Sequence, residues 1–297
     1  MKLIRPLAMT PAALIASNVA EADYPAWSAA TSYAAAERVI VLEDHTIYES
    51  LTSANLNQTP GITPTAWKVI GATNRWRMFD YILGSQTSNP DSITVSLLAT
   101  GRCDAIALLN VVAASARFVM TDAVDGVVYD KTYSLVSVEG IADWYSYFFE
   151  PIFSKTDLVE LELPPYANVT LTITLAAAGS MVACGACVIG QQRTLGGTQY
   201  GAKIGIQDYS GKTRDAQGNY AIAQRAFSKR ATFTLQIDSR MVDHLQTLLA
   251  GYRSTPIVYI GSELYGATML YGFYKDFSVD IAYANTAFCS LELEGLT

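Results

Sequence analysis

The sequence predicts a mainly β chain: a small aromatic β module, then a jelly-roll-like β-sandwich, then a β-rich domain with one amphipathic helix. Three observations predict this fold class. Apolar and polar residues alternate in many short runs, which is the pattern of half-buried strands. Glycine, proline and other turn-forming residues separate these runs. One longer stretch, near residues 239–250, instead repeats its apolar residues at helical spacing.

The length of the chain predicts two or three domains, and its composition predicts that it buries surface against other chains. The 297 residues include 51% hydrophobic and 16% charged residues, and the low share of charges departs from that of an ordinary soluble domain. The net charge is −7, and Lys229-Arg230 is the one pair of adjacent basic residues. This charge distribution argues against binding to nucleic acid.

Residues 1–21 form an N-terminal segment. Lys2 and Arg5 precede an apolar stretch, as in a signal peptide, but Pro6 and Pro11 interrupt that stretch and keep it short. A short helix with Thr10 as N-cap and Pro11 at its first position is the better interpretation. No run reaches the roughly 18 apolar residues of a membrane span. We therefore expect a chain without a membrane span that is made and assembled in a cytoplasm without export.

Residues 22–80 form the small aromatic module. Three of the four tryptophans of the chain lie between Tyr24 and Asp80. Large aromatic side chains let a short segment bury enough area to fold. The residues set at short intervals between turn formers are Trp27, Tyr33, Val39, Tyr48, Trp67 and Trp76.

This pattern resembles the small chitin-type carbohydrate-binding modules. It is most similar to the version built into bacteriophage tail proteins, which runs on into a TNRW-x-MFD sequence like Thr73 to Asp80. The resemblance implies a sugar that stacks on exposed rings. However, the tandem tryptophans of the family are absent after Tyr48, and Trp27, Tyr33 and Trp67 match positions that mainly build the fold. Core packing is thus the first interpretation of these rings, and the candidate glycan-binding residues are Trp27, Tyr33 and Tyr48.

Residues 81–192 predict a β-sandwich. Gly84 to Pro90 has loop composition, and the alternation that begins near Ser92 predicts about eight strands with no convincing helix. Asp125-Gly126 predicts a hairpin turn between neighbouring strands. In the aromatic stretch Trp144 to Phe153, further candidates for glycan contact are Trp144, Tyr145 and Tyr147; the alternative is a strand that packs into the sandwich or against a neighbour. The order of features resembles galactose-binding-like jelly rolls.

Residues 193–297 predict a β-rich domain with a helix near 239–250. Asp238 or Ser239 caps this helix and Gly251 ends it. Strands are expected before the helix and after it, the last running from Ala287 to Glu294. The Asp208-Tyr-Ser opening and the Ser290-Leu-Glu-Leu-Glu ending resemble domains of tail-tip and baseplate proteins from long-tailed phages.

The residues that usually carry chemistry do not combine into a site. Cys184 and Cys187 have CxxC spacing, but no second CxxC or nearby histidine accompanies them, and the surrounding residues read as a buried strand. The two histidines, His45 and His244, are not accompanied by a nucleophile motif. The carboxylate pairs Glu160/Glu162 and Glu292/Glu294 fit solvated strand faces better than a glycosidase site. Asp208 and Asp215 lack the order of a calcium loop.

We therefore expect no catalytic residue, no metal and no cofactor. The resemblances imply a structural component of a tailed-phage virion, at the baseplate or upper tail fibre, assembled in the host cytoplasm. The expected partners are further copies of the chain in a homotrimer, other phage tail and baseplate proteins, and host-surface carbohydrate. One alternative is a glycan-binding adhesin for receptor recognition, and another is a hydrolase of cell-wall or capsule glycans.

Overall fold

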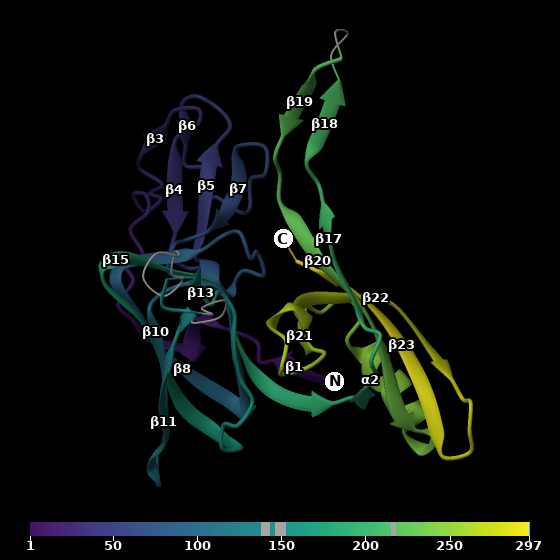
Figure 1. The fold of residues 1–297 in the computed structure, drawn as a ribbon. Helices are drawn as coiled ribbons and strands as arrows, with labels where there is room; N and C mark the ends of the chain where they lie inside the picture. Colours follow the sequence, from purple (N-terminus) through teal and green to yellow (C-terminus); the bar gives the residue numbers. More distant parts are fainter. Residues whose placement is uncertain (138–142, 146–152, 215–217, 297) are drawn as a thin grey trace.

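The computed structural model describes residues 1–137, 143–145, 153–214 and 218–296. The fold is mainly β, as the sequence predicts, with large antiparallel sheets and one ten-residue α-helix, α2 (Val242–Gly251). Figure 1 shows a small module above a first lobe, a second lobe beside it, and a long hairpin that projects from the second lobe. The described residues contain no helix long and apolar enough to cross a membrane.

The aromatic module folds as two small antiparallel sheets around an aromatic core. One sheet has the order β4-β5-β7, and the other pairs β3 with β6. Trp67 lies at the centre of the core, where Tyr33 contacts it edge-on with ring centroids 5.3 Å apart. The strands are β3 (Ser32–Tyr33), β4 (Arg38–Val41), β5 (Thr46–Ser50), β6 (Asn55–Leu56) and β7 (Trp67–Ala72).

The first lobe, here called the sandwich lobe, is built around the long antiparallel pair of β8 and β15. Strand β15 pairs with β8, β9 and β10 along its length, and the residues between these strands form one large apolar core. The predicted Asp125-Gly126 turn is confirmed, because it joins β10 to β11. The strands are β8 (Thr87–Cys103), β9 (Ala105–Val112), β10 (Ser115–Asp122), β11 (Gly126–Ser134), β12 (Val136–Ser137), β13 (Phe153–Ser154), β14 (Leu158–Glu160) and β15 (Tyr166–Thr194).

The second lobe, here called the C-terminal lobe, packs α2 on an antiparallel sheet. Leu245 and Leu249 of α2 are buried against this sheet, which confirms the predicted helix. Asp238 caps the 3₁₀ turn Ser239–Met241 that leads into it. The strands are β16 (Gly197–Thr198), β17 (Lys203–Asp208), β18 (Gly211–Arg214), β19 (Tyr220–Ala223), β20 (Phe227–Asp238), β21 (Ile257–Ile260), β22 (Met269–Asp280) and β23 (Thr286–Gly295), with a 3₁₀ turn at Gly266–Thr268.

The N-terminal segment departs from the prediction. Strand β1 (Lys2–Pro6) lies between β15 of the sandwich lobe and β21 of the C-terminal lobe, so it joins both lobes in one 14-stranded sheet. Pro11–Ala13 forms only a 3₁₀ turn, without a side-chain cap from Thr10, and β2 (Leu14–Ser17) then pairs with β8. Pairing with strands far along the chain overrides the local helix pattern.

Two further boundaries follow from the structure. Trp76 to Leu83 connects the aromatic module to β8 and contains a 3₁₀ turn, Arg77–Phe79. Strand β15 runs through residues 169–190 as one strand and also crosses residue 192, where the sandwich was expected to end. Of the aromatic stretch at 144–153, residues 146–152 lie outside the described part.

Candidate interaction surfaces

The candidate glycan-binding residues build the core of the aromatic module. Tyr33 is 7% exposed and Tyr48 is 5% exposed, while Trp27 is half-buried against the same cluster. The Tyr48 hydroxyl donates to the Asp44 carboxylate at 2.7 Å. Burial, the larger cause, and this hydrogen bond together raise the pKa of Tyr48 to about 12. A sugar stacks on an open ring face, which Tyr33 and Tyr48 do not offer. The burial of Tyr33 and Tyr48 favours core packing, the first interpretation of these rings, while Trp27 keeps part of its surface exposed.

A buried polar cluster joins the module to the sandwich lobe. The Glu21 carboxylate accepts from Thr73 Oγ1 at 2.7 Å and lies 2.8 Å from His45 Nδ1. The His45 ring stacks on Trp76, with centroids 4.2 Å apart. Arg75, whose Nη1 lies 3.5 Å from Glu21, donates through Nε to the Val19 carbonyl. His45 thus occupies a structural junction.

The predicted carboxylate pairs differ in their surroundings. Glu160 is 5% exposed, accepts from the Glu162 backbone N–H and lies 3.5 Å from Lys131, so the expected solvated face is wrong for this residue. Glu162 is exposed. Among the described residues no group of three or more His, Cys, Asp or Glu side chains is placed to hold a metal ion. All four cysteines are free and buried.

A hairpin arm, made of residues 203–214 and 218–230, is the most exposed part of the described chain. Its base pairs β17 with β20, and its outer part pairs β18 with β19. Figure 1 shows it standing away from both lobes. Twelve residues from Lys203 to Arg214 correspond to a reach of about 40 Å at roughly 3.3 Å per residue. The arm is thus a long, thin projection.

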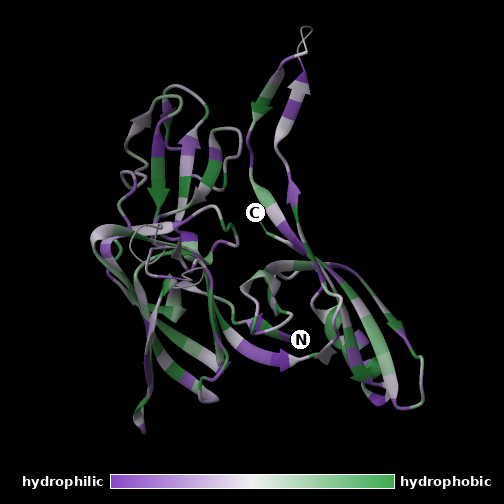
Figure 2. Cartoon of the chain, viewed as in Figure 1, coloured by the Kyte–Doolittle hydropathy of each residue, from purple (hydrophilic) through white to green (hydrophobic). Residues whose placement is uncertain are grey.

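The arm exposes apolar side chains that no other part of the described chain covers. Hydrophobic and hydrophilic residues alternate along it (Figure 2). At the base Ile204, Ile206 and Phe227 are exposed, and on the outer hairpin Tyr220 and Ile222 are 58% and 68% exposed. An isolated two-stranded hairpin is only marginally stable in water. The arm therefore has the properties of a segment that packs against a partner.

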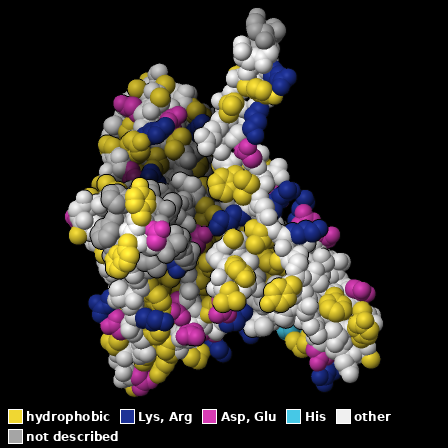
Figure 3. Space-filling model, in the orientation of Figure 1, with side chains coloured by type: hydrophobic (Ala, Val, Ile, Leu, Met, Phe, Trp, Pro, Cys, Tyr) yellow, Lys and Arg dark blue, Asp and Glu magenta, His cyan; other side chains and the backbone are white. Residues whose placement is uncertain are grey.

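The arm is also basic, as the dark blue side chains along it in Figure 3 show. Residues 203–230 contain six of the 20 Lys and Arg residues and two of the 27 Asp and Glu residues. The segment therefore carries a net charge of +4, and the rest of the chain carries −11. On the outer hairpin Lys212 and Arg214 lie on the same strand face as Ile222 and Tyr220, their cross-strand partners.

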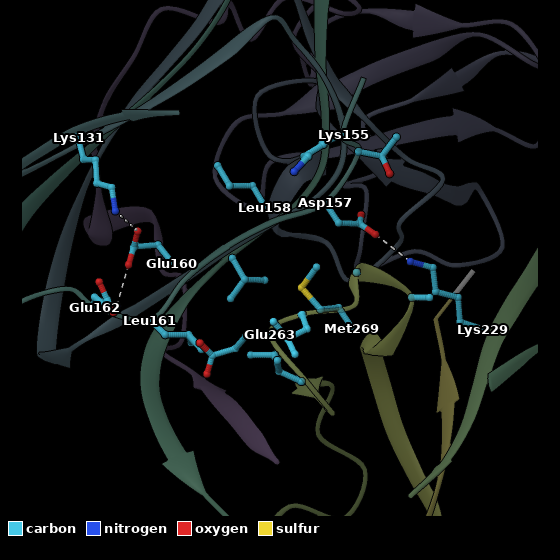
Figure 4. Close-up of a pocket in the computed structure, with 16 residues that line it drawn as sticks. Lys131, Lys155, Asp157, Leu158, Glu160, Leu161, Glu162, Lys229, Glu263 and Met269 are labelled. Atoms are coloured by element: carbon cyan, nitrogen blue, oxygen red, sulfur yellow. Dashed lines mark hydrogen bonds and ion pairs between the residues drawn. The ribbon is translucent and has the colours of Figure 1, made fainter. Parts of the chain in front are cut away.

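A groove runs between the two lobes (Figure 4). It has a volume of about 610 Å³ and lies between residues 155–162 of the sandwich lobe and residues 260–269 of the C-terminal lobe. A second hollow of about 410 Å³ continues from it toward the base of the arm, sharing Asp157, Lys229 and Met269. We call the two together the inter-lobe groove.

The inter-lobe groove combines apolar and charged side chains. Leu158, Leu161 and Met269 lie along it, and Leu264 is 85% exposed at its edge. Four carboxylates and three ammonium groups line the larger hollow: Asp157, Glu160, Glu162, Glu263, Lys131, Lys155 and Lys229. Lys229 Nζ lies 2.8 Å from the Asp157 carboxylate, which ties the lobes together across the floor. The larger hollow therefore presents more polar than apolar surface.

The sequence predicted neither the arm nor the groove as a site. The excess of basic residues between Lys203 and Arg230 is visible in the sequence. However, the alternation of apolar residues in the same segment fits a buried strand equally well. The groove requires β14 and the turn after β21, which are far apart in sequence. No protein-family model matches the chain, and no curated protein matches it either.

Proposed function

We propose that the chain is a structural component of a tailed-phage virion, at the baseplate or upper tail fibre, which assembles with further copies of itself and with other tail proteins. The observation that carries the proposal is the hairpin arm. A projection of this length, with exposed apolar side chains and little support from its own chain, suits assembly into a larger particle.

Two observations from the sequence support this proposal. The low share of charged residues fits a protein that buries surface against other chains. The resemblance of Thr73 to Asp80, and of the last domain, to phage tail proteins supplies the class of particle. A homotrimer at the baseplate or fibre is the assembly that these resemblances imply.

The burial of Tyr33 and Tyr48 supports a spacer role for the aromatic module. Glu21 of the N-terminal segment binds His45 and Thr73 of the module, and Asn74 hydrogen-bonds with Ser88 of β8, so the module is connected to the sandwich lobe by polar contacts. Glycan contact through these rings would require the module to open. The proposed function is accordingly mechanical, with β-rich parts joined into one stiff subunit.

Mass spectrometry of purified virions tests the proposal. We expect the chain to be present in virions of the phage that encodes it, with a fixed copy number that is a multiple of three. Its absence from intact virions would contradict a structural role. Release of reducing sugar or peptidoglycan fragments by the purified protein would instead support the hydrolase alternative.

An arm-truncated variant tests the role of the arm. Asp208 and Phe227 are paired across the hairpin, so a two-residue Asn-Gly turn can replace residues 209–226 without moving the base. We expect this variant to fold but to fail to complement tail assembly. Normal tails assembled from it would contradict the role given to the arm.

A further inference from the structure

The arm and the inter-lobe groove complement each other, although they lie on different parts of the chain. The arm presents exposed Tyr220 and Ile222 beside Lys212 and Arg214. The larger hollow of the groove offers leucines and Met269 with a small excess of carboxylates. This hollow has a volume of about 610 Å³, roughly that of twenty water molecules, which is room for several side chains of a strand.

We propose that the arm of one copy lies in the inter-lobe groove of a second copy of the same chain. This inference rests on the proposed function and deepens it, since it names the surfaces through which the subunits contact each other. Tyr220 and Ile222 contact Leu264 and the apolar side chains of the groove. Lys212 and Arg214 lie near the carboxylates of Glu162 and Glu263.

Charge distinguishes two possible contacts between copies, arm against arm and arm against body. Contact between two arms would bring two segments of net charge +4 together, which is repulsive. Contact between an arm and the body of another copy brings +4 against −11. The second arrangement also leaves the like-charged arms apart, so the charge distribution favours it.

The groove is available for a strand from outside. Lys131 is engaged by Glu160 at 3.5 Å and Lys229 by Asp157 at 2.8 Å, so these two ammonium groups are already neutralised by carboxylates of the same subunit. Glu263 pairs with Lys2 at 2.7 Å but is 61% exposed, and Glu162 is exposed. These two carboxylates at the rim are the ones that an incoming basic arm would meet.

This contact is head-to-tail, because the surfaces on the two subunits differ. A head-to-tail contact produces a ring when its rotation closes and a filament when it does not. The homotrimer proposed above is a closed ring of three such contacts. Each subunit then gives one arm and receives one arm.

Cysteine cross-linking tests the direction of the contact. The four native cysteines are buried, so introduced surface cysteines are the reactive ones. We expect an Ile222→Cys variant mixed with a Leu264→Cys variant to form a covalent dimer under mild oxidation, and neither variant to do so alone. Cross-linking of Ile222→Cys by itself would show arm-to-arm contact and overturn the proposal.

Charge reversal tests the contact by a second route. One double variant reverses the arm charges, Lys212→Glu with Arg214→Glu, and another reverses the groove charges, Glu162→Lys with Glu263→Lys. We expect each to weaken self-association at least tenfold in sedimentation experiments. Mixing the two double variants should restore a hetero-oligomer. Lys68→Glu with Arg253→Glu has the same charge change as the arm variant, away from arm and groove, and should leave association unchanged. Circular dichroism checks that each variant is folded.

The outcomes separate this inference from the proposed function. A wild-type chain that stays monomeric at high concentration but is present in virions overturns the inference and leaves the role as a virion component intact. A chain that forms the cross-linked ring but is absent from virions supports the arm-in-groove contact and overturns the role as a virion component. Equal association of the arm variant and the Lys68/Arg253 control also overturns the inference.

Discussion

At the scale of single residues, the cysteines illustrate how burial decides chemistry. Cys184 and Cys187 lie on β15 with side chains in the sandwich core, where Cys103 also lies. Burial raises the pKa of Cys103 to about 11 and that of Cys184 to about 12, and it raises the pKa of Cys187 well above its ordinary value. Because the thiolate is the form that reacts and binds metals, these raised pKa values argue against redox or zinc chemistry at the CxxC spacing.

We expect none of the four thiols to react with a disulfide reagent such as DTNB in the folded protein at pH 8. The raised pKa values leave about a thousandth or less of each of the sandwich-core thiols ionised at that pH, and burial excludes the reagent. All four should react in concentrated guanidinium chloride, which serves as the positive control. One rapidly reacting thiol in the folded protein, or tightly bound zinc in the purified sample, would contradict this expectation.

At the scale of elements, strand β1 has the largest structural consequence. It lies between β15 and β21, and Leu3 and Ile4 on it are fully buried in two different cores. The close approach of β1 to β15 depends on Gly190. A Cβ built on Gly190 would lie 1.9 Å from the Arg5 carbonyl oxygen, which belongs to the backbone of β1.

Gly190→Ala should therefore destabilise the protein by about 1–3 kcal/mol, the usual cost of forcing extra volume into a packed interior. Since 1 kcal/mol shifts the melting temperature of a large domain by about 2–4 °C, calorimetry should show a clear decrease. Gly197→Ala on β16 is the matched control, because no atom lies within 4 Å of a Cβ built there. Equal melting temperatures for the two variants would show that β1 does not approach β15 this closely.

The elements that the sequence predicted correctly are those set by neighbouring residues. The Asp125-Gly126 hairpin and helix α2 with its Asp238 cap depend on a few adjacent positions. Strand β1 was missed because its partners lie about 190 and 255 residues away along the chain. The buried position of Glu160 was missed for the same reason, since Lys131 from β11 supplies its partner.

The candidate site was less predictable than the fold. The aromatic rings of Tyr33 and Tyr48 have the same sequence pattern whether they pack inward or face a ligand. Likewise the alternation of Ile204 with Ile206 does not distinguish a covered strand from a projecting one. Exposure is a property of the assembled chain, and only the three-dimensional arrangement separates these cases.

At the scale of the whole molecule, the body is stabilised by its own apolar cores, whereas the arm has few stabilising contacts within its own chain. The lobes share one 14-stranded sheet and large apolar cores. The outer hairpin of β18 and β19 has four paired residues on each strand and no apolar core of its own in the described residues. Segments with few buried contacts open locally far more often than cores do.

Hydrogen exchange should therefore report the contact between copies directly. In the Glu162→Lys, Glu263→Lys variant, which leaves the arm unchanged and is expected to lose self-association, the backbone amides of residues 220–223 should exchange within seconds, because the isolated hairpin opens readily. In the wild-type oligomer the same amides should be slowed at least tenfold, since the groove of the next subunit covers the hairpin. Amides of β15 should be equally protected in both samples. Fast exchange of residues 220–223 in a wild-type oligomer would mean that another surface holds the subunits together.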